Sequence, residues 1–271
     1  AGTGRYIERN MTMNHEMTSN IQLSYENTFD QHHINAVLGF EAKKARYPYM
    51  YMLGNPEANG IPFLDLTSLS NITDGIGNPQ TRMGYIGRLN YDYANKYIIE
   101  LSGRYDGSYR YKEGKRWGFF PSGSVGYRIS EENFWKENDF LSNYIDNFKI
   151  RASYGVLGEE LGTALSHIVG YNYNSGGAVL DGALVTGSQV TGLATDNISW
   201  GRSKILNIGF DLGLMNNRLN ASIDVFRRDQ TGLLASRYDV KIPDEVGFTL
   251  PQENLNSNYA KGIDASVNWR D

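Results

Sequence analysis

Apolar and polar side chains alternate residue by residue along much of this chain, and that alternation constrains the fold more than any other feature. Between residues 82 and 93 one set is Met83, Tyr85, Leu89, Tyr91 and Tyr93, and the opposing set is Arg82, Arg88, Asn90 and Asp92. Successive side chains of a β-strand point to opposite faces. A period of two therefore predicts a strand with one apolar and one polar face.

Similar alternation predicts nine strands in all. They lie near residues 18–28, 34–44, 82–92, 97–106, 118–129, 148–157, 206–212, 219–225 and 259–270. The 19 Tyr and 30 Gly favour strands and tight turns over helices. The best helical candidate is Ser130–Asn143, with Ser130 as its candidate N-cap. The sequence thus predicts an all-β chain.

The predicted connections alternate between short and long. Short links fall near Asp30, Ala94 and Asn216, with Ser130–Asn147 as the exception, and long links cover Tyr47–Gln80, Gly107–Trp117, Gly158–Trp200 and Thr231–Asn258. Long structureless loops are uncommon in a compact soluble domain. An antiparallel transmembrane β-barrel combines short periplasmic turns with long extracellular loops. We therefore expect a segment of such a barrel.

Which face meets lipid does not follow from alternation alone, because a soluble barrel turns its apolar face inward. Tyr91, Tyr93 and Tyr97 surround one short turn, as in the aromatic girdle of a membrane barrel. Cross-strand aromatic packing in a soluble sheet is the alternative. We predict that the faces carrying Tyr97-Ile99-Leu101 and Leu206-Ile208-Phe210-Leu212 meet lipid. Arg88, Glu100 and Arg104 are predicted to form a charge network facing the lumen.

Composition and motifs argue against several other functions. The net charge of −4 does not favour a nucleic-acid partner. Cysteine is absent, and no phosphate-binding glycine loop or nucleophile motif occurs, so we expect no enzyme, cofactor or metal site. His32-His33 fits a solvated turn better than a metal site, and Glu159-Glu160 a solvated loop better than a catalytic acid pair. Ala1–Asn10 lacks the pattern of a signal peptide.

Several strings in one order resemble the barrel of SusC/RagA-type TonB-linked outer-membrane proteins. They are Arg104-Tyr105-Asp106-Gly107-Ser108, Arg116-Trp117-Gly118-Phe119-Phe120-Pro121-Ser122, Gly126-Tyr127-Arg128-Ile129-Ser130, Phe148-Lys149-Ile150-Arg151-Ala152-Ser153-Tyr154-Gly155, Ile198-Ser199-Trp200, Asn207-Ile208-Gly209-Phe210-Asp211 and Asn216-Asn217-Arg218-Leu219. The resemblance runs from about Thr18 to the end. Tyr127, Gly201 and Gly158-Glu159-Glu160 depart from the family pattern.

The resemblance implies that residues 1–271 are the C-terminal part of a TonB-dependent receptor barrel of about 22 strands. A plug domain, a TonB box and a signal peptide are not among these residues. The whole protein would import glycans or peptides across the outer membrane of a Gram-negative bacterium. Its implied partners are a SusD-like surface lipoprotein, the TonB complex and outer-membrane lipid. The alternative is a soluble secreted all-β carbohydrate-binding protein.

Aromatic residues in the long loops are the candidate substrate-binding residues, because sugar rings stack on Tyr and Trp faces and such loops line a substrate chamber. They are Tyr109, Tyr111, Tyr171, Tyr173 and Trp200. No catalytic or metal-binding residue is expected. Packing of the loops against one another is the alternative role for each aromatic residue. The mixed charges of Lys112–Arg116 fit a solvated loop best, and the alternative is contact with lipopolysaccharide phosphates.

Overall fold

The computed structural model describes residues 6–55, 69–77, 79–243 and 247–270. Its described residues contain fourteen β-strands in three sheets, and its helices are short. The chain divides into two units, one made of residues 1–20 and 41–83, and the other of residues 21–40 and 84–271. No helix among the described residues is long and apolar enough to cross a membrane.

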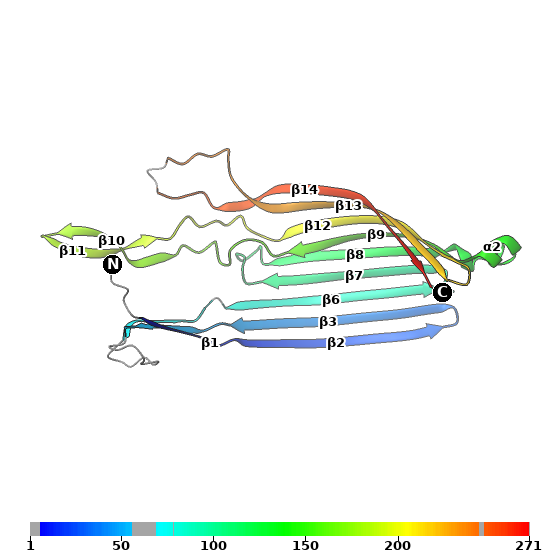
Figure 1. The fold of residues 1–271 in the computed structure, drawn as a ribbon, viewed down its shortest axis with the longest axis horizontal. Helices are drawn as coiled ribbons and strands as arrows, with labels where there is room; N and C mark the ends of the chain where they lie inside the picture. The colour runs from blue at the N-terminus through cyan, green and yellow to red at the C-terminus, as the bar shows by residue number, and fades with distance from the viewer. Residues whose placement is uncertain (1–5, 56–68, 78, 244–246, 271) are drawn as a thin grey trace. The chain divides into compact units, whose positions relative to one another are not determined.

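The main sheet has nine strands in the order β14-β13-β12-β9-β8-β7-β6-β3-β2 (Figure 1). They are β2 (His15–Phe29), β3 (His32–Arg46), β6 (Gln80–Tyr93), β7 (Tyr97–Ser108), β8 (Trp117–Arg128), β9 (Ile145–Glu159), β12 (Gly201–Leu214), β13 (Leu219–Ser236) and β14 (Gln252–Trp269). Each of the nine predicted strands corresponds to one of these, so the antiparallel barrel segment is confirmed. In this order β2 and β14 are the edges, and the nine strands do not close a barrel.

Tight turns join the strands at one end of the sheet. Ala94 and Asn95 have φ of 52° and 59°, and Lys96 N–H donates to the Tyr93 carbonyl at 2.9 Å. Two consecutive positive φ angles are typical of a type I′ turn, whose twist matches that of the flanking strands. Asn216 and Asn217 have the same sign of φ in the β12–β13 turn, as expected of asparagine.

The predicted helix at Ser130–Asn143 forms three short pieces, a 3-10 turn η1 (Ile129–Glu131), α1 (Asn133–Lys136) and α2 (Asp139–Tyr144). The expected capping role of Ser130 is wrong, because its buried hydroxyl has no hydrogen-bond partner. Asn138 caps α2 instead, with its side-chain oxygen 3.1 Å from the N–H groups of Phe140 and Leu141.

The long links are not free of structure, which corrects the sequence prediction. The link 47–80 contains β4 (Tyr49–Gly54) and β5 (Leu69–Gly75), which form a sheet with β1 (Ile7–Thr12), while its residues 56–68 and 78 lie outside the described residues. The link 158–200 contains the hairpin of β10 (Tyr171–Leu180) and β11 (Ala183–Val190). Asp181-Gly182 forms its turn, with φ of 51° and 77°, and Asp-Gly is a dipeptide typical of such hairpin turns.

The main sheet has an apolar and a polar face. On β7 and β12 the alternate residues Tyr97, Ile99, Leu101, Leu206, Ile208 and Phe210 are exposed, with 54% exposure at Ile208. Buried side chains instead collect where the strands meet the long loops, among them Tyr111, Phe120, Val156 and Ile198. The sheet therefore has no core of its own on its apolar face.

Candidate functional site in the polar face and the loops

Ion pairs line the polar face of the sheet. The Arg88 guanidinium on β6 lies 2.9 Å from the Glu100 carboxylate on β7, which confirms the predicted pair. Arg104, the third member of the predicted network, pairs with Asp106 on its own strand at 2.9 Å. These side chains flank a depression of about 380 Å³ whose floor includes Ser102, Ser122 and the Phe120 ring.

A second cluster lies further along the same face. Arg151 on β9 lies 2.6 Å from Asp224 on β13 and 3.3 Å from Asp211 on β12. Gly209 on β12 is the direct strand partner of both Arg151 and Asp224. A side chain there would clash with Asp224, so glycine leaves room for the ion pair across β12. Asn207 lines a neighbouring depression of about 200 Å³, and its Oδ1 atom is buried without a hydrogen-bond partner.

Two of the predicted aromatic residues, Tyr111 and Trp200, hold the loops together. Tyr111 is 2% exposed, and its hydroxyl accepts from the Leu161 N–H at 2.8 Å and donates to the Leu161 carbonyl at 3.2 Å. Trp200 donates from Nε1 to the Arg116 carbonyl at 2.9 Å and contacts the Tyr111 ring edge-on, with centroids 5.6 Å apart. The Tyr111 ring is therefore covered by protein.

The Phe120 ring joins this cluster to the sheet, and the sequence did not single it out. It contacts Trp200 edge-on at a centroid distance of 5.3 Å. A Cβ atom at Gly118 or Gly158 would clash with this ring. The two glycines thus form the space in which Phe120 lies over the sheet.

Further hydrogen bonds tie the 158–200 link to β13, β14 and the 107–117 link. The Asn254 side chain accepts from the Ser199 N–H at 2.7 Å, donates to the Ser199 carbonyl at 3.1 Å, and donates to the Gly232 carbonyl. Lys112 pairs with Asp196 across two loops, and its hydrogen bond lowers the pKa of Asp196 below the usual value. Lys115 also donates to the Asp196 carbonyl at 2.6 Å, and Arg116 to the Tyr111 carbonyl at 3.1 Å, so the segment Lys112–Arg116 is engaged within the protein.

Tyr171 and Tyr173 lie on β10, which corrects the expectation that they belong to no strand. They are paired in register with Val190 and Ser188 of β11. Because a single residue lies between them on the strand, their side chains point to the same face. Tyr171 is 55% exposed and Tyr173 is 82% exposed. Tyr109, the remaining candidate, is half-buried next to Ser108. The exposed candidates are thus concentrated on the hairpin.

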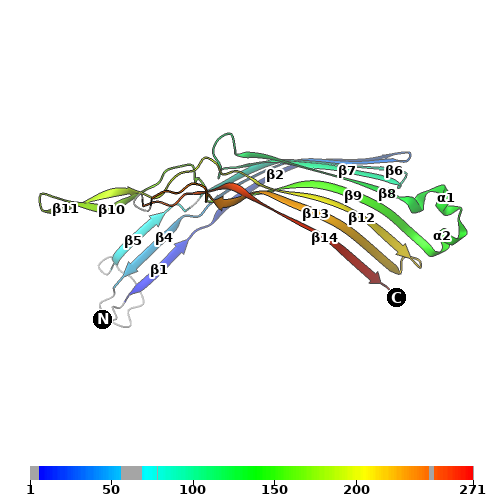
Figure 2. The ribbon, with the colours of Figure 1, turned by 90° about the horizontal axis from the view of Figure 1, so that it is seen from above.

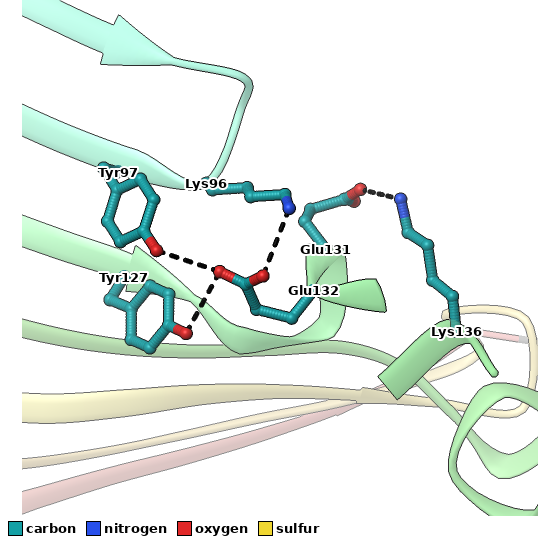
Figure 3. Close-up of polar contacts among 6 residues, drawn as sticks. All are labelled: Lys96, Tyr97, Tyr127, Glu131, Glu132 and Lys136. Carbon is teal, nitrogen blue, oxygen red and sulfur yellow. Dashed lines mark hydrogen bonds and ion pairs between the residues drawn. The ribbon is translucent and has the colours of Figure 1, made fainter. Parts of the chain in front are cut away.

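At the turn end of the sheet, Glu132 collects hydrogen bonds from two strands and a turn (Figure 3). Lys96 lies 3.2 Å from its Oε2 atom, and the hydroxyls of Tyr97 and Tyr127 lie 3.0 and 3.2 Å from Oε1. The two tyrosine rings stack with centroids 5.1 Å apart. The hydrogen bonds from Lys96 and then Tyr97 lower the pKa of Glu132. This cluster anchors the 129–144 link to β7 and β8.

Residues 1–270 match the family described as TonB dependent receptor-like, beta-barrel. The chain belongs to this family. TonB-dependent receptor P39 of Formosa agariphila is 32% identical over 258 residues, which cover 90% of this chain and 23% of that protein. TonB-dependent receptor SusC of Bacteroides thetaiotaomicron is 32% identical over 191 residues, 69% of this chain and 18% of its own length. The resemblance to SusC/RagA proteins is therefore confirmed.

The solved structures agree on the fold of this receptor barrel segment. The RagAB peptide importer in its closed-closed state has a TM-score of 0.77 at 22% identity, over 96% of this chain and 28% of that chain. Its open-open state has a TM-score of 0.71. The chain thus spans about a quarter of the length of proteins of this kind.

The matched family is one of receptors. Among the described residues, no group of three His, Cys, Asp or Glu side chains could hold a metal ion.

Proposed function

We propose that this chain is part of an outer-membrane transporter that imports glycans or peptides with energy supplied through TonB. The observation that carries the proposal is the contrast between the two faces of the nine-stranded sheet. One face leaves Ile99, Leu101 and Ile208 exposed, and the other carries the Arg88–Glu100 and Arg151–Asp224 ion pairs. An apolar outer face and a polar interior are the two faces of a transmembrane barrel.

Aromatic residues near both limits of the apolar face support the membrane assignment. At the turn end Tyr97 stacks on Tyr127, and at the loop end Tyr105 stacks on Trp117 with centroids 4.7 Å apart. The stretch of β7 from Tyr97 to Tyr105 is nine residues long, roughly 26 Å of extended chain. This length suits a strand that crosses the apolar band obliquely, with aromatic girdles at both interfaces.

The polar face would line the lumen, and the loops would meet the substrate from outside. We infer that Tyr171 and Tyr173 form an aromatic platform on the β10–β11 hairpin, because they share a face and are both exposed. Tyr109 and Trp200 would contribute at the loop bases, and Tyr111 would act by holding the loop in place. The similarity to SusC and to the RagAB importer favours a SusD-like lipoprotein as the partner over these loops.

The test uses the whole transporter that contains this chain, produced in its own host. Tyr171→Ala with Tyr173→Ala should reduce substrate binding and growth on the imported nutrient, while the amount of assembled barrel in the outer membrane is unchanged. Tyr238→Ala, another highly exposed loop tyrosine, is the matched control. Unchanged binding and uptake in a correctly assembled double variant would refute the platform.

A further inference from the structure

Four basic residues stand on the apolar face of three adjacent strands. Arg202 and Lys204 lie on β12 in phase with Leu206, Ile208 and Phe210. Arg227 lies on β13 in phase with Ile223 and Val225, and Lys261 lies on β14 in phase with Ile263 and Val267. All four side chains are exposed. They form what we name the basic rim.

The basic rim marks the point at which the apolar face ends toward the long loops. Beyond Arg227 and Lys261, the same face carries Asp229, Thr231 and Tyr259. On β7 and β8 the corresponding border is aromatic, made by Tyr105 and Trp117. The border of the apolar face is therefore aromatic on one side of the sheet and cationic on the other.

The four cations lie close enough to act on one ligand. Arg227 on β13 is the direct strand partner of Lys261 on β14. On its other side Arg227 is the partner of Leu206 on β12, and Lys204, two residues before Leu206, is the partner of Asp229. With strands about 4.8 Å apart and about 6.8 Å between alternate residues, the basic rim spans on the order of 15 Å.

Arg227 is already oriented toward the loop end. Its guanidinium makes hydrogen bonds of 2.9 to 3.1 Å with the Asp229 carboxylate and lies 5.8 Å from the centroid of the Tyr259 ring. By contrast, none of the ion pairs within the described part of the chain engages Arg202, Lys204 or Lys261. Three of the four cations are thus free for an anion from outside the chain.

Protection of the sheet edge does not account for the basic rim. Charged residues on an edge strand hinder pairing with other chains, and Lys261 on β14 suits that role. Arg202 and Lys204 lie two strands further in, where both neighbours are paired. A cation on an apolar face needs an anion or water within reach of its head group.

We propose that the basic rim binds the phosphate groups of a phosphorylated membrane lipid whose acyl chains lie along Val225, Ile263 and the adjacent apolar face. Arginine and lysine form charge-assisted hydrogen bonds with phosphate oxygens, and such head groups occur at the border of the apolar band. A free phosphate ion would use the cations alone, whereas a lipid uses both the cations and the apolar surface beside them. The inference rests on the proposed contact of this face with lipid.

The experiment uses the whole transporter in neutral detergent. Its parent form is titrated with diphosphoryl lipid A, monophosphoryl lipid A, phosphatidylcholine and inorganic phosphate, and retained lipid is measured by native mass spectrometry. The test variant Lys204→Gln with Lys261→Gln removes two charges from the basic rim. The control variant Lys149→Gln with Arg228→Gln removes two charges from the opposite face of β9 and β13.

The parent and the control should retain diphosphoryl lipid A better than monophosphoryl lipid A, and phosphatidylcholine least. The test variant should bind diphosphoryl lipid A roughly thirtyfold more weakly than the parent. This is the combined effect of two removed cations, each of which lowers the affinity by about tenfold or less. Equal retention by the test variant and the parent would overturn the proposal, as would equal loss in the control. Binding of inorganic phosphate as strong as that of the lipid would overturn it too.

Failure of this test is distinguishable from failure of the proposed membrane contact. The substitution Ile208→Asp places a charge on the apolar face and tests the membrane contact separately. If the lipid selectivity is absent but Ile208→Asp still destabilises the inserted barrel, only the basic rim proposal is lost. If a charge at Ile208 has no effect, the orientation of the face itself is wrong.

Discussion

The Arg88 guanidinium on β6 donates to the Glu100 carboxylate on β7 over 2.9 Å. The two strands are joined by a tight turn in which Ala94 and Asn95 have a left-handed backbone conformation. The pair is partly exposed, with side-chain exposures of 52% and 34%. Such partly exposed ion pairs contribute little to folding stability, because solvent screens the charges and two long side chains lose conformational freedom.

The first prediction follows from that exposure. A double-mutant cycle with Arg88→Ala and Glu100→Ala should give a coupling free energy of about 0.2–1 kcal/mol. Thermal unfolding of the whole barrel in detergent, followed by the mobility shift of the unfolded form on gels, measures it. A coupling of several kcal/mol would show that the pair is desolvated in the complete protein, against our expectation.

The second prediction concerns the orientation of the apolar face. Ile208→Asp should destabilise the inserted barrel by about 2 kcal/mol, because a carboxylate on the lipid side loses its hydration. Ser153→Asp on the polar face of the neighbouring strand is the control and should have a smaller effect. Folding titrations in lipid vesicles measure both. If Ile208→Asp inserts and melts like the parent, the face does not meet lipid.

The third prediction concerns Asn254 on β14, whose side chain makes three hydrogen bonds, two with Ser199 and one with Gly232 on β13. Asn254→Ala leaves a Ser199 N–H and two carbonyls without that partner, at a local cost of about 1–3 kcal/mol. Amide hydrogen exchange near Ser199 and Gly232 should then be faster, while exchange in the main sheet is unchanged. Asn258→Ala, on the exposed part of β14, is the control. Equal exchange in both variants would contradict the role of Asn254.

The fourth prediction concerns pH. Because Lys96 and Tyr97 lower the pKa of Glu132 in the folded protein, the carboxylate contributes stability that is fully present above the ordinary glutamate value of about 4.3. That contribution is lost as the pH falls through the lowered pKa. Stability of the 129–144 link should therefore decline at acidic pH in the parent, and less so in Glu132→Gln. Glu131→Gln, which alters the separate bond to Lys136, should keep the pH dependence of the parent.

The sequence by itself determined the nine long strands and their up-and-down order. Alternation with a period of two is a local property of a strand, and residues such as Asn95, Asn216 and Asn217 accept the left-handed backbone that tight turns need. Because short turns force neighbouring strands to pair, the Arg88–Glu100 contact also followed from the sequence. Figure 2 shows the resulting sheet from above, with the strands side by side.

Only the tertiary structure decided what the loop residues do. Tyr111 and Trp200 look alike in sequence to Tyr171 and Tyr173, but the first two pack in the loop cluster and the last two are exposed on β10. Burial of Tyr111 depends on Leu161 and Trp200, far away in the chain, so no local pattern predicts it. The basic rim likewise exists because register places Arg227 beside Lys261. Contacts between distant segments depend on strand pairing and loop packing. Both involve residues that are far apart in the sequence, so a local pattern does not reveal them.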